Sequence, residues 1–234
     1  MTILIMIANM NELGEILNEA KSAGHALDRQ VIGNNTFYIQ RRNNHNIYIV
    51  KSEPGALNSG AALLTLTEAL NNIDIDTIIF SGIAFGNYYK KGNGQNIGDI
   101  LVSRQLWNYE SGKMSQEYIS RGDKISATPW LLDRFTNSAL EWKDSEIHFG
   151  LIASGEKLSN SEAFVKRLMK KEPEIIGGEM EGTALIAVAQ RYMKSWILVK
   201  GISDWGVDKR DDSQRDVAKM TLQYVFMTID KYFI

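Results

Sequence analysis

Apolar runs alternate with amphipathic stretches along the chain. The run at 2–8 is continuous, as expected for a strand covered on both faces. Apolar residues then recur at helical spacing over 9–22. The same alternation predicts strands at 77–80, 98–103, 147–152 and 196–202, and helices at 58–70, 128–142, 161–171, 182–192 and 213–232. Two strands at 37–40 and 47–50 flank a polar segment, which is the pattern of a hairpin.

Regular alternation of strands and helices is typical of an α/β protein. Residues 88–96 and 107–123 show no clear period, so we expect loops there, the second with short pieces of regular structure. We find no linker, repeat or low-complexity segment. The pattern therefore predicts one domain over 1–234, a three-layer α/β/α sandwich with a mixed, mostly parallel central sheet.

Composition narrows the class of protein further. The net charge of -2 gives no support for a nucleic-acid surface. Without cysteine the chain has neither disulfides nor a thiolate metal site, and none of its three histidines has a neighbour at metal-ligand spacing. No apolar run reaches the roughly 20 residues that cross a bilayer. The first residues lack a basic region of the signal-peptide type, so we expect a cytoplasmic protein that does not enter a membrane.

Two segments of the second half carry the clearest candidate chemistry. Glu179 and Glu181 flank Met180 where a helix is predicted to begin, and the apolar run 198–202 ends in Ser203–Asp204. Ligands of open α/β sheets bind outside the carboxyl ends of the strands, so the two segments are expected to form opposite walls of one pocket. Simpler explanations are acids favoured by a helix dipole and a turn after a strand.

Two earlier segments also place polar groups after strands. Asn9 and Glu12 have the spacing of a capping box, and Glu12 is free to serve a site as well. The run 81–86 contains glycines, which let the backbone approach a ligand closely, although glycine turns after strands are common. Ser154–Gly155 follows the strand predicted at 147–152.

Taken in order, these motifs resemble the purine nucleoside phosphorylase/nucleosidase superfamily. The resemblance rests on 8–12, 81–86, 98–103, Ser154–Gly155, the Glu-Met-Glu of 179–181 and Ser203–Asp204. The chain is similar to the methylthioadenosine/S-adenosylhomocysteine nucleosidases. It is more similar still to the phosphorylase-like domains of bacterial defence and signalling proteins, some of which are ATP nucleosidases.

The resemblance implies a role for each motif. Asp204 would protonate N7 of the departing purine, with Ser203 helping to hold it. Glu181 would accept hydrogen bonds from the ribose hydroxyls above Met180, and Glu12 would orient or deprotonate the attacking water. The other residues expected to bind substrate are Asn9, Gly82, Ile83, Ala84, Phe85, Leu158 and Glu179. Leu158 stands where the nucleosidases usually place a base-stacking Phe, a role that Phe85 or Trp205 could take over.

Cleavage of an N-glycosidic bond fits these residue types. An acid on the base side and a carboxylate on the water side are the arrangement of inverting glycoside hydrolysis, and no metal or cofactor is required. The bacterial phosphorylases of this family carry a Gly-Asp-Pro-x-x-Arg-like loop after the first strand. Here 8–12 has no basic group and ends in Glu12, which would repel phosphate, so we favour hydrolysis.

The 5′ side of the substrate and its biological setting stay open. Asn9 replaces a residue that is apolar in the methylthioadenosine enzymes, which suggests that the substrate has a polar 5′ group. One such substrate is ATP, and its conversion to adenine and ribose 5′-triphosphate would serve antiphage defence. Basic residues available for 5′ phosphates are Arg41, Arg42, Lys90, Lys91, Arg104, Arg121 and Lys157. A salvage phosphorylase and a non-catalytic nucleotide sensor are the alternatives. The family resemblance implies a homodimer or larger homo-oligomer.

Overall fold

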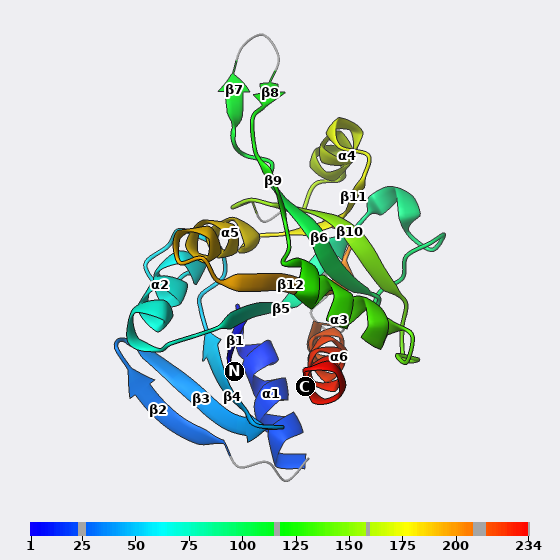
Figure 1. Cartoon of the computed structure of the whole chain (residues 1–234). Helices are drawn as coiled ribbons and strands as arrows, with labels where there is room; N and C mark the ends of the chain where they lie inside the picture. The colour runs from blue at the N-terminus through cyan, green and yellow to red at the C-terminus, as the bar shows by residue number, and fades with distance from the viewer. Residues whose placement is uncertain (23–26, 115–117, 158–159, 208–213, 234) are drawn as a thin grey trace.

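One large sheet runs through the molecule with helices on both of its sides (Figure 1). The computed structural model describes residues 1–22, 27–114, 118–157, 160–207 and 214–233. The strands are β1 (Thr2–Ile7), β2 (Asp28–Ile32), β3 (Asn35–Arg42), β4 (His45–Lys51), β5 (Thr77–Gly86), β6 (Ile100–Asn108), β7 (Gly112–Met114), β8 (Tyr118–Ser120), β9 (Lys124–Ser126), β10 (Ile147–Ser154), β11 (Ile175–Glu179) and β12 (Ser195–Asp204). The helices are α1 (Met10–Ser22), α2 (Ala62–Asn72), the short η1 (Tyr88–Lys90), α3 (Pro129–Ala139), α4 (Glu162–Lys171), α5 (Gly182–Arg191) and α6 (Gln214–Tyr232).

The sheet is mixed, as predicted. Its order is β11-β10-β6-β12-β5-β1-β4-β3-β2, and β9 adds to β6. Pairings are parallel within β4-β1-β5-β12 and within β6-β10-β11, and antiparallel for β12 with β6 and for β2, β3 and β4. Residues Ile3 to Ile7 of β1 are fully buried, which confirms a strand covered on both faces.

The three layers of the predicted sandwich are present. Helices α2 and α5 pack against each other on one side of the sheet, and α6 packs against α1 and α3 on the other (Figure 1). Gly201 of β12 allows α6 to lie close, because a Cβ there would come 2.4 Å from atoms of Thr221 and Val217. No helix in the described ranges has both the length and the apolar character needed to span a membrane.

The structure corrects the prediction of a glycine turn at 81–86. That segment continues β5, whose far end also pairs antiparallel with β11, so that β5, β12, β6, β10 and β11 close on themselves. Glycines permit this pairing, since a Cβ on Gly177 would lie 2.4 Å from the carbonyl oxygen of Phe85. Strand β2 was not predicted, and the segment 107–123 contains the β7–β8 hairpin.

Candidate active site

The predicted site residues gather around one cavity of about 360 Å³ at the ends of β1, β5, β11 and β12. Ten of them line it: Asn9, Glu12, Ile83, Ala84, Phe85, Glu179, Met180, Glu181, Ser203 and Asp204. Gly82 contacts the carboxylate of Glu12 from beside the cavity. Leu158 lies outside the described residues. The strand ends thus bring together segments that are far apart in the chain.

Glu12 both caps a helix and faces the cavity. The Asn9 side-chain oxygen accepts a hydrogen bond from the Glu12 N–H at 3.0 Å, and Glu12 Oε2 accepts from the N–H of Asn9 at 3.1 Å and of Ala8 at 2.7 Å. This is the predicted capping box. The other oxygen, Oε1, accepts from the N–H of Ile83 at 3.2 Å. The capping role therefore fixes the carboxylate at the cavity.

Gly82 makes room for this carboxylate. Its φ is +147°, and a Cβ there would lie 2.5 Å from Glu12 Oε1 and 3.1 Å from Lys200 Nζ. A side chain at this position would be strained as well as obstructed. The absence of a side chain at Gly82 thus leaves room for the charged groups of Glu12 and Lys200.

Sequence reasoning missed Lys200, which lies among the acids. The side chain is 1% exposed, and its Nζ is 3.1 Å from Glu181 Oε2 and 3.9 Å from Glu179 Oε2. The ammonium group also lies 4.4 Å from the centre of the Phe80 ring, a cation–π distance. The signal was available, because lysine is almost never fully buried unless it is paired and this one interrupts the apolar run 196–202.

Burial and mutual charge set the ionisation of this cluster. Burial raises the pKa of Glu12, and Lys200 offsets only part of that rise. Burial opposes the charge of Lys200, but Glu181, Glu179 and Glu12 together raise the pKa of the ammonium group. Burial likewise raises the pKa of Glu179, whereas for Glu181 the effects of Lys200 and of the Gly55 N–H outweigh burial and lower the pKa. Glu181 and Lys200 thus form an ion pair, and Glu12 is a carboxylate of increased basicity.

The two acids that flank Met180 have different environments. The carboxylate of Glu179 accepts hydrogen bonds from the N–H of Glu181 at 2.8 Å and of Gly182 at 2.9 Å, where α5 begins. Glu179 is therefore the helix-terminal acid that the simpler explanation predicted. Glu181 is the N-cap residue of α5, but its side chain makes no capping hydrogen bond. Its Oε1 accepts from the N–H of Gly55 at 3.0 Å, and its Oε2 faces Lys200.

Ser203 and Asp204 end β12 beside β5. The register between the two strands shifts between Ile202 and Asp204, an irregularity of the kind that re-aims side chains beside active sites. Asp204 Oδ1 accepts a hydrogen bond from the N–H of Gly206 at 2.6 Å, and Ser203 Oγ donates to Asp204 Oδ2 at 3.0 Å. The turn predicted as the simpler explanation is present, and it holds the carboxylate at the cavity.

Among the basic residues considered for 5′ phosphates, Lys157 lines the cavity. Its ammonium group pairs with Glu110 and lies 5.9 Å from the centre of the Tyr109 ring. Arg42 instead pairs with Asp230 at 3.2 Å, and Arg121 lines a separate hollow beside α5. The described carboxylates and histidines include no group of three or more placed to hold a metal ion.

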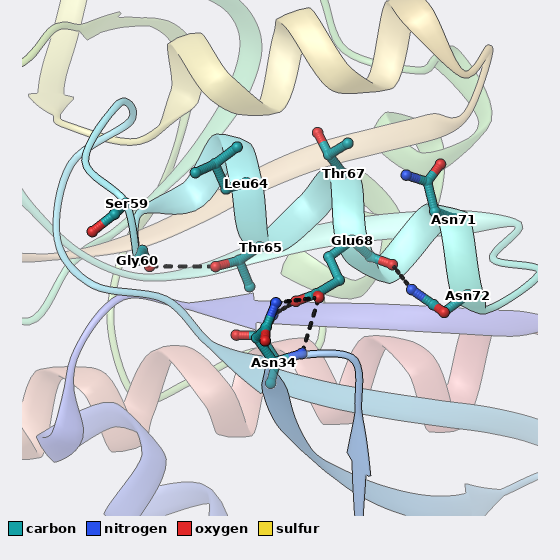
Figure 2. A pocket seen from close by; sticks show the side chains of 10 residues that line it. Asn34, Ser59, Gly60, Leu64, Thr65, Thr67, Glu68, Asn71 and Asn72 are labelled. Carbon is teal, nitrogen blue, oxygen red and sulfur yellow. Dashed lines mark hydrogen bonds between the residues drawn. The ribbon is translucent and has the colours of Figure 1, made fainter.

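A larger hollow of about 540 Å³ lies between the β2–β3 turn and α2 (Figure 2). Among the described residues that line it, Glu68 is the one ionisable side chain. Its Oε1 accepts from the backbone N–H and the side-chain amide of Asn34, each at 2.9 Å, and its Oε2 accepts from the Asn35 amide. Glu68 thereby fastens the turn to α2. The hollow contains none of the predicted site residues, so the smaller cavity is the candidate active site.

Comparison with known proteins identifies the family of the chain. The chain is 25% identical over 186 residues to the 5′-methylthioadenosine/S-adenosylhomocysteine nucleosidase of Geobacillus, covering 76% of this chain and 75% of that protein. It is 26% identical over 204 residues to the nucleosidase of the same name from Buchnera aphidicola, covering 83% and 81%.

Two solved structures show the same fold. The futalosine hydrolase of Helicobacter pylori superposes with a TM-score of 0.82 at 21% identity, covering 98% of this chain and 97% of that one. The S-adenosylhomocysteine nucleosidase of Streptococcus pyogenes, in complex with 5-methylthiotubericidin, gives 0.83 at 19% identity, covering 99% and 97%. The family model of the phosphorylase superfamily matches residues 2–229, and the chain belongs to that superfamily.

Proposed function

We propose that this protein hydrolyses the bond between base and ribose in a purine nucleoside or nucleotide. The observation that carries the proposal is one cavity lined by Glu12, Glu181 and Lys200 together with Asp204. Such a set supplies a base for water, a group for the sugar hydroxyls and an acid for the leaving purine. The names of the similar proteins, which are nucleosidases and a hydrolase, support the same reaction class.

The charge of the cavity favours water over phosphate as the nucleophile. Glu12, Glu179 and Glu181 all line it, and Lys200 is the cation buried among them. A phosphate dianion beside this cluster would meet three carboxyl groups and the ammonium group of Lys200, which is already paired, while the other lysine that lines the cavity, Lys157, pairs with Glu110. Water carries no such cost, and a carboxylate whose pKa is raised by burial is a better acceptor of its proton.

In the proposed reaction each of these side chains has one role. A water molecule gives a proton to Glu12 and forms the new C1′–O bond while the bond from C1′ to the purine nitrogen breaks. The electrons of that bond pass to the purine, which takes a proton from Asp204 at N7. Glu181 accepts hydrogen bonds from the ribose hydroxyls. Lys200 balances the charge of Glu181 and holds its carboxylate in place.

The rim of the cavity favours a polar 5′ substituent. Asn9, Asn11 and Gln214 line it together with Lys157 and Pro54. Amide side chains provide hydrogen-bond partners for phosphate or hydroxyl oxygens and suit them better than an alkylthio group. We therefore include ATP among the substrates, with adenine and ribose 5′-triphosphate as products and nucleotide depletion in antiphage defence as the setting.

We also propose that the chain forms a homodimer or larger homo-oligomer. The family resemblance supports this, and so do two exposed leucines around the start of α2, Leu57 at 67% and Leu64 at 51% exposure. Light scattering coupled to gel filtration measures the mass directly. A mass of 26.4 kDa at micromolar concentration would contradict the proposal.

Release of adenine tests the proposed reaction. ATP, AMP, adenosine and methylthioadenosine are each incubated with wild type and with Asp204→Asn, with and without phosphate. We expect release that does not need phosphate and is lost in the variant. Release only with phosphate would indicate a salvage phosphorylase, and binding without release would indicate a nucleotide sensor. Full activity on methylthioadenosine with none on ATP would exclude the ATP proposal.

A further inference from the structure

One aromatic ring stands in the candidate active site. Among the described residues that line the cavity, Phe85 is the single aromatic side chain. Trp205, the other residue considered for base stacking, is 7% exposed and belongs to the main hydrophobic core, with its ring against Gly86. Leucine, the residue at position 158, has no aromatic face. A flat base that enters this cavity therefore has one aromatic surface to meet.

The strand register places Phe85 beside the proposed acid. Phe85 is opposite Asp204 of β12 in one pairing and opposite Gly178 of β11 in the other. Asp204 must reach N7 of the purine, so the base has to lie at this end of the cavity. The ring of Phe85 consequently lies beside the expected position of the purine, and not at the sugar end of the cavity, where Glu12 and Glu181 are.

Two glycines leave room for the ring of Phe85. A Cβ on Gly178 would lie 2.4 Å from Cζ of Phe85, so the ring lies directly across that residue. A Cβ on Gly206 would lie 3.6 Å from Cγ of the same ring, and Gly206 has a φ of +71° that favours glycine. The ring also packs on a small cluster that includes Trp107 and Leu168. It is thus held on several sides while remaining half-buried at the cavity.

We propose that Phe85 is the platform on which the purine base stacks, and that it determines the affinity for the base. The proposal rests on the proposed function for the identity of the base, and it assigns this role to β5 instead of position 158. Stacking of a base on an aromatic side chain contributes about 5- to 150-fold to binding, judged by alanine substitution. Stacking does not distinguish one purine from another, so the polar groups around Asp204 must discriminate between purines.

Binding of adenine, measured by calorimetry, tests the proposal without requiring turnover. Phe85→Leu keeps an apolar side chain but removes the aromatic face, and we expect adenine to bind at least about fivefold more weakly. Phe85→Tyr keeps the face and should bind within about threefold of wild type. Phe164→Leu is the matched control, because Phe164 packs on the same cluster without lining the cavity, and it should leave binding unchanged.

A second measurement keeps the proposal testable if Phe85→Leu does not fold. In protein labelled only at phenylalanine, we expect a nuclear Overhauser effect between ring protons and adenine H2 or H8. Phe85→Tyr replaces the labelled ring and should abolish that signal. A signal that persists in Phe85→Tyr, or adenine affinity unchanged in Phe85→Leu, would overturn the proposal, as would a wild type that binds no purine.

A failure of the proposed function would give a different pattern of results from a failure of the stacking proposal. If wild type binds adenine through Phe85 but releases no base from any substrate, the platform stands and hydrolysis does not. If wild type releases adenine and Phe85→Leu has the same KM, hydrolysis stands and the platform does not. Stacking is present in ground state and transition state alike, so the platform predicts a raised KM with kcat little changed.

Discussion

Removal of the buried ammonium group should destabilise the protein severely. Lys200→Met keeps an unbranched side chain of similar length but leaves the carboxylates of Glu179 and Glu181 without their cation. At 3.1 Å and an effective dielectric constant of about 20, the pair with Glu181 alone has a Coulomb energy of about 5 kcal/mol, before the cost of burying both charges. Loss of one partner of a buried ion pair costs about 3–5 kcal/mol.

Urea denaturation measures this loss, and Lys194→Met is the control. Lys194 pairs with Asp74 at 3.6 Å, but Asp74 is 98% exposed, so its loss should cost about 1 kcal/mol or less. For a domain of this size, about 3–5 kcal/mol corresponds to a fall in Tm of about 6–20 °C. A Lys200→Met variant within about 0.5 kcal/mol of wild type at pH 8 would refute the reasoning.

The loss of stability in Lys200→Met should also depend on pH. Lys200 lowers the pKa values of Glu12, Glu179 and Glu181, so all three rise when it is removed, and those of Glu12 and Glu179 already lie above the value of about 4.3 that glutamate has in the unfolded chain. A group whose pKa is raised by folding contributes stability at low pH, and that contribution is lost as the pH rises through the folded pKa. The deficit of Lys200→Met should therefore be smaller at pH 5 than at pH 8. A deficit of equal size at both would contradict the assignment of charges.

Three further variants test single groups of the site. Glu12→Gln should lower kcat by about 10²–10⁴-fold while adenine binding is kept, and a rate within tenfold of wild type would exclude Glu12 as the base. Because burial raises the pKa of Glu12, the wild-type rate should fall on acidification at a higher pH than it would with an ordinary glutamate as the base. Asn9→Ala removes the acceptor of the Glu12 N–H and should cost about 1 kcal/mol in urea denaturation, whereas no loss would mean that the capping box contributes nothing. Burial raises the pKa of Glu179, so wild type should lose stability relative to Glu179→Gln as the pH rises from 5 to 8; the opposite trend would contradict that shift.

Much of the site could be predicted because its chemistry is local in sequence. The capping box of Asn9 and Glu12 is a short-range pattern, and it is formed as the spacing predicts. Acids that follow buried strands meet at one edge of the sheet, so Glu181 and Asp204 line the same cavity. In each case the neighbouring residues predict which strand end carries the side chain.

The remainder depends on contacts between distant segments. The pairing of β5 with β11 places Phe85 opposite Gly178, and no local sequence pattern predicts a pairing between segments so far apart in the chain. Parallel pairing with β12 extends β5 through a glycine-containing run that resembles a turn. Lys200 illustrates a different reason: its place in the apolar run 196–202 indicates burial, but the three carboxyl groups around it belong to other segments.

The source of the oxygen that joins C1′ tests the central claim most directly. Wild type is incubated with its best substrate in water enriched in ¹⁸O, with phosphate present, and the sugar product is analysed by mass spectrometry. Attack by water beside Glu12 predicts one ¹⁸O atom at C1′ in the first turnover and no sugar 1-phosphate. A sugar 1-phosphate without label from water would contradict hydrolysis and would show that phosphate reaches C1′ despite the carboxyl groups of Glu12, Glu179 and Glu181.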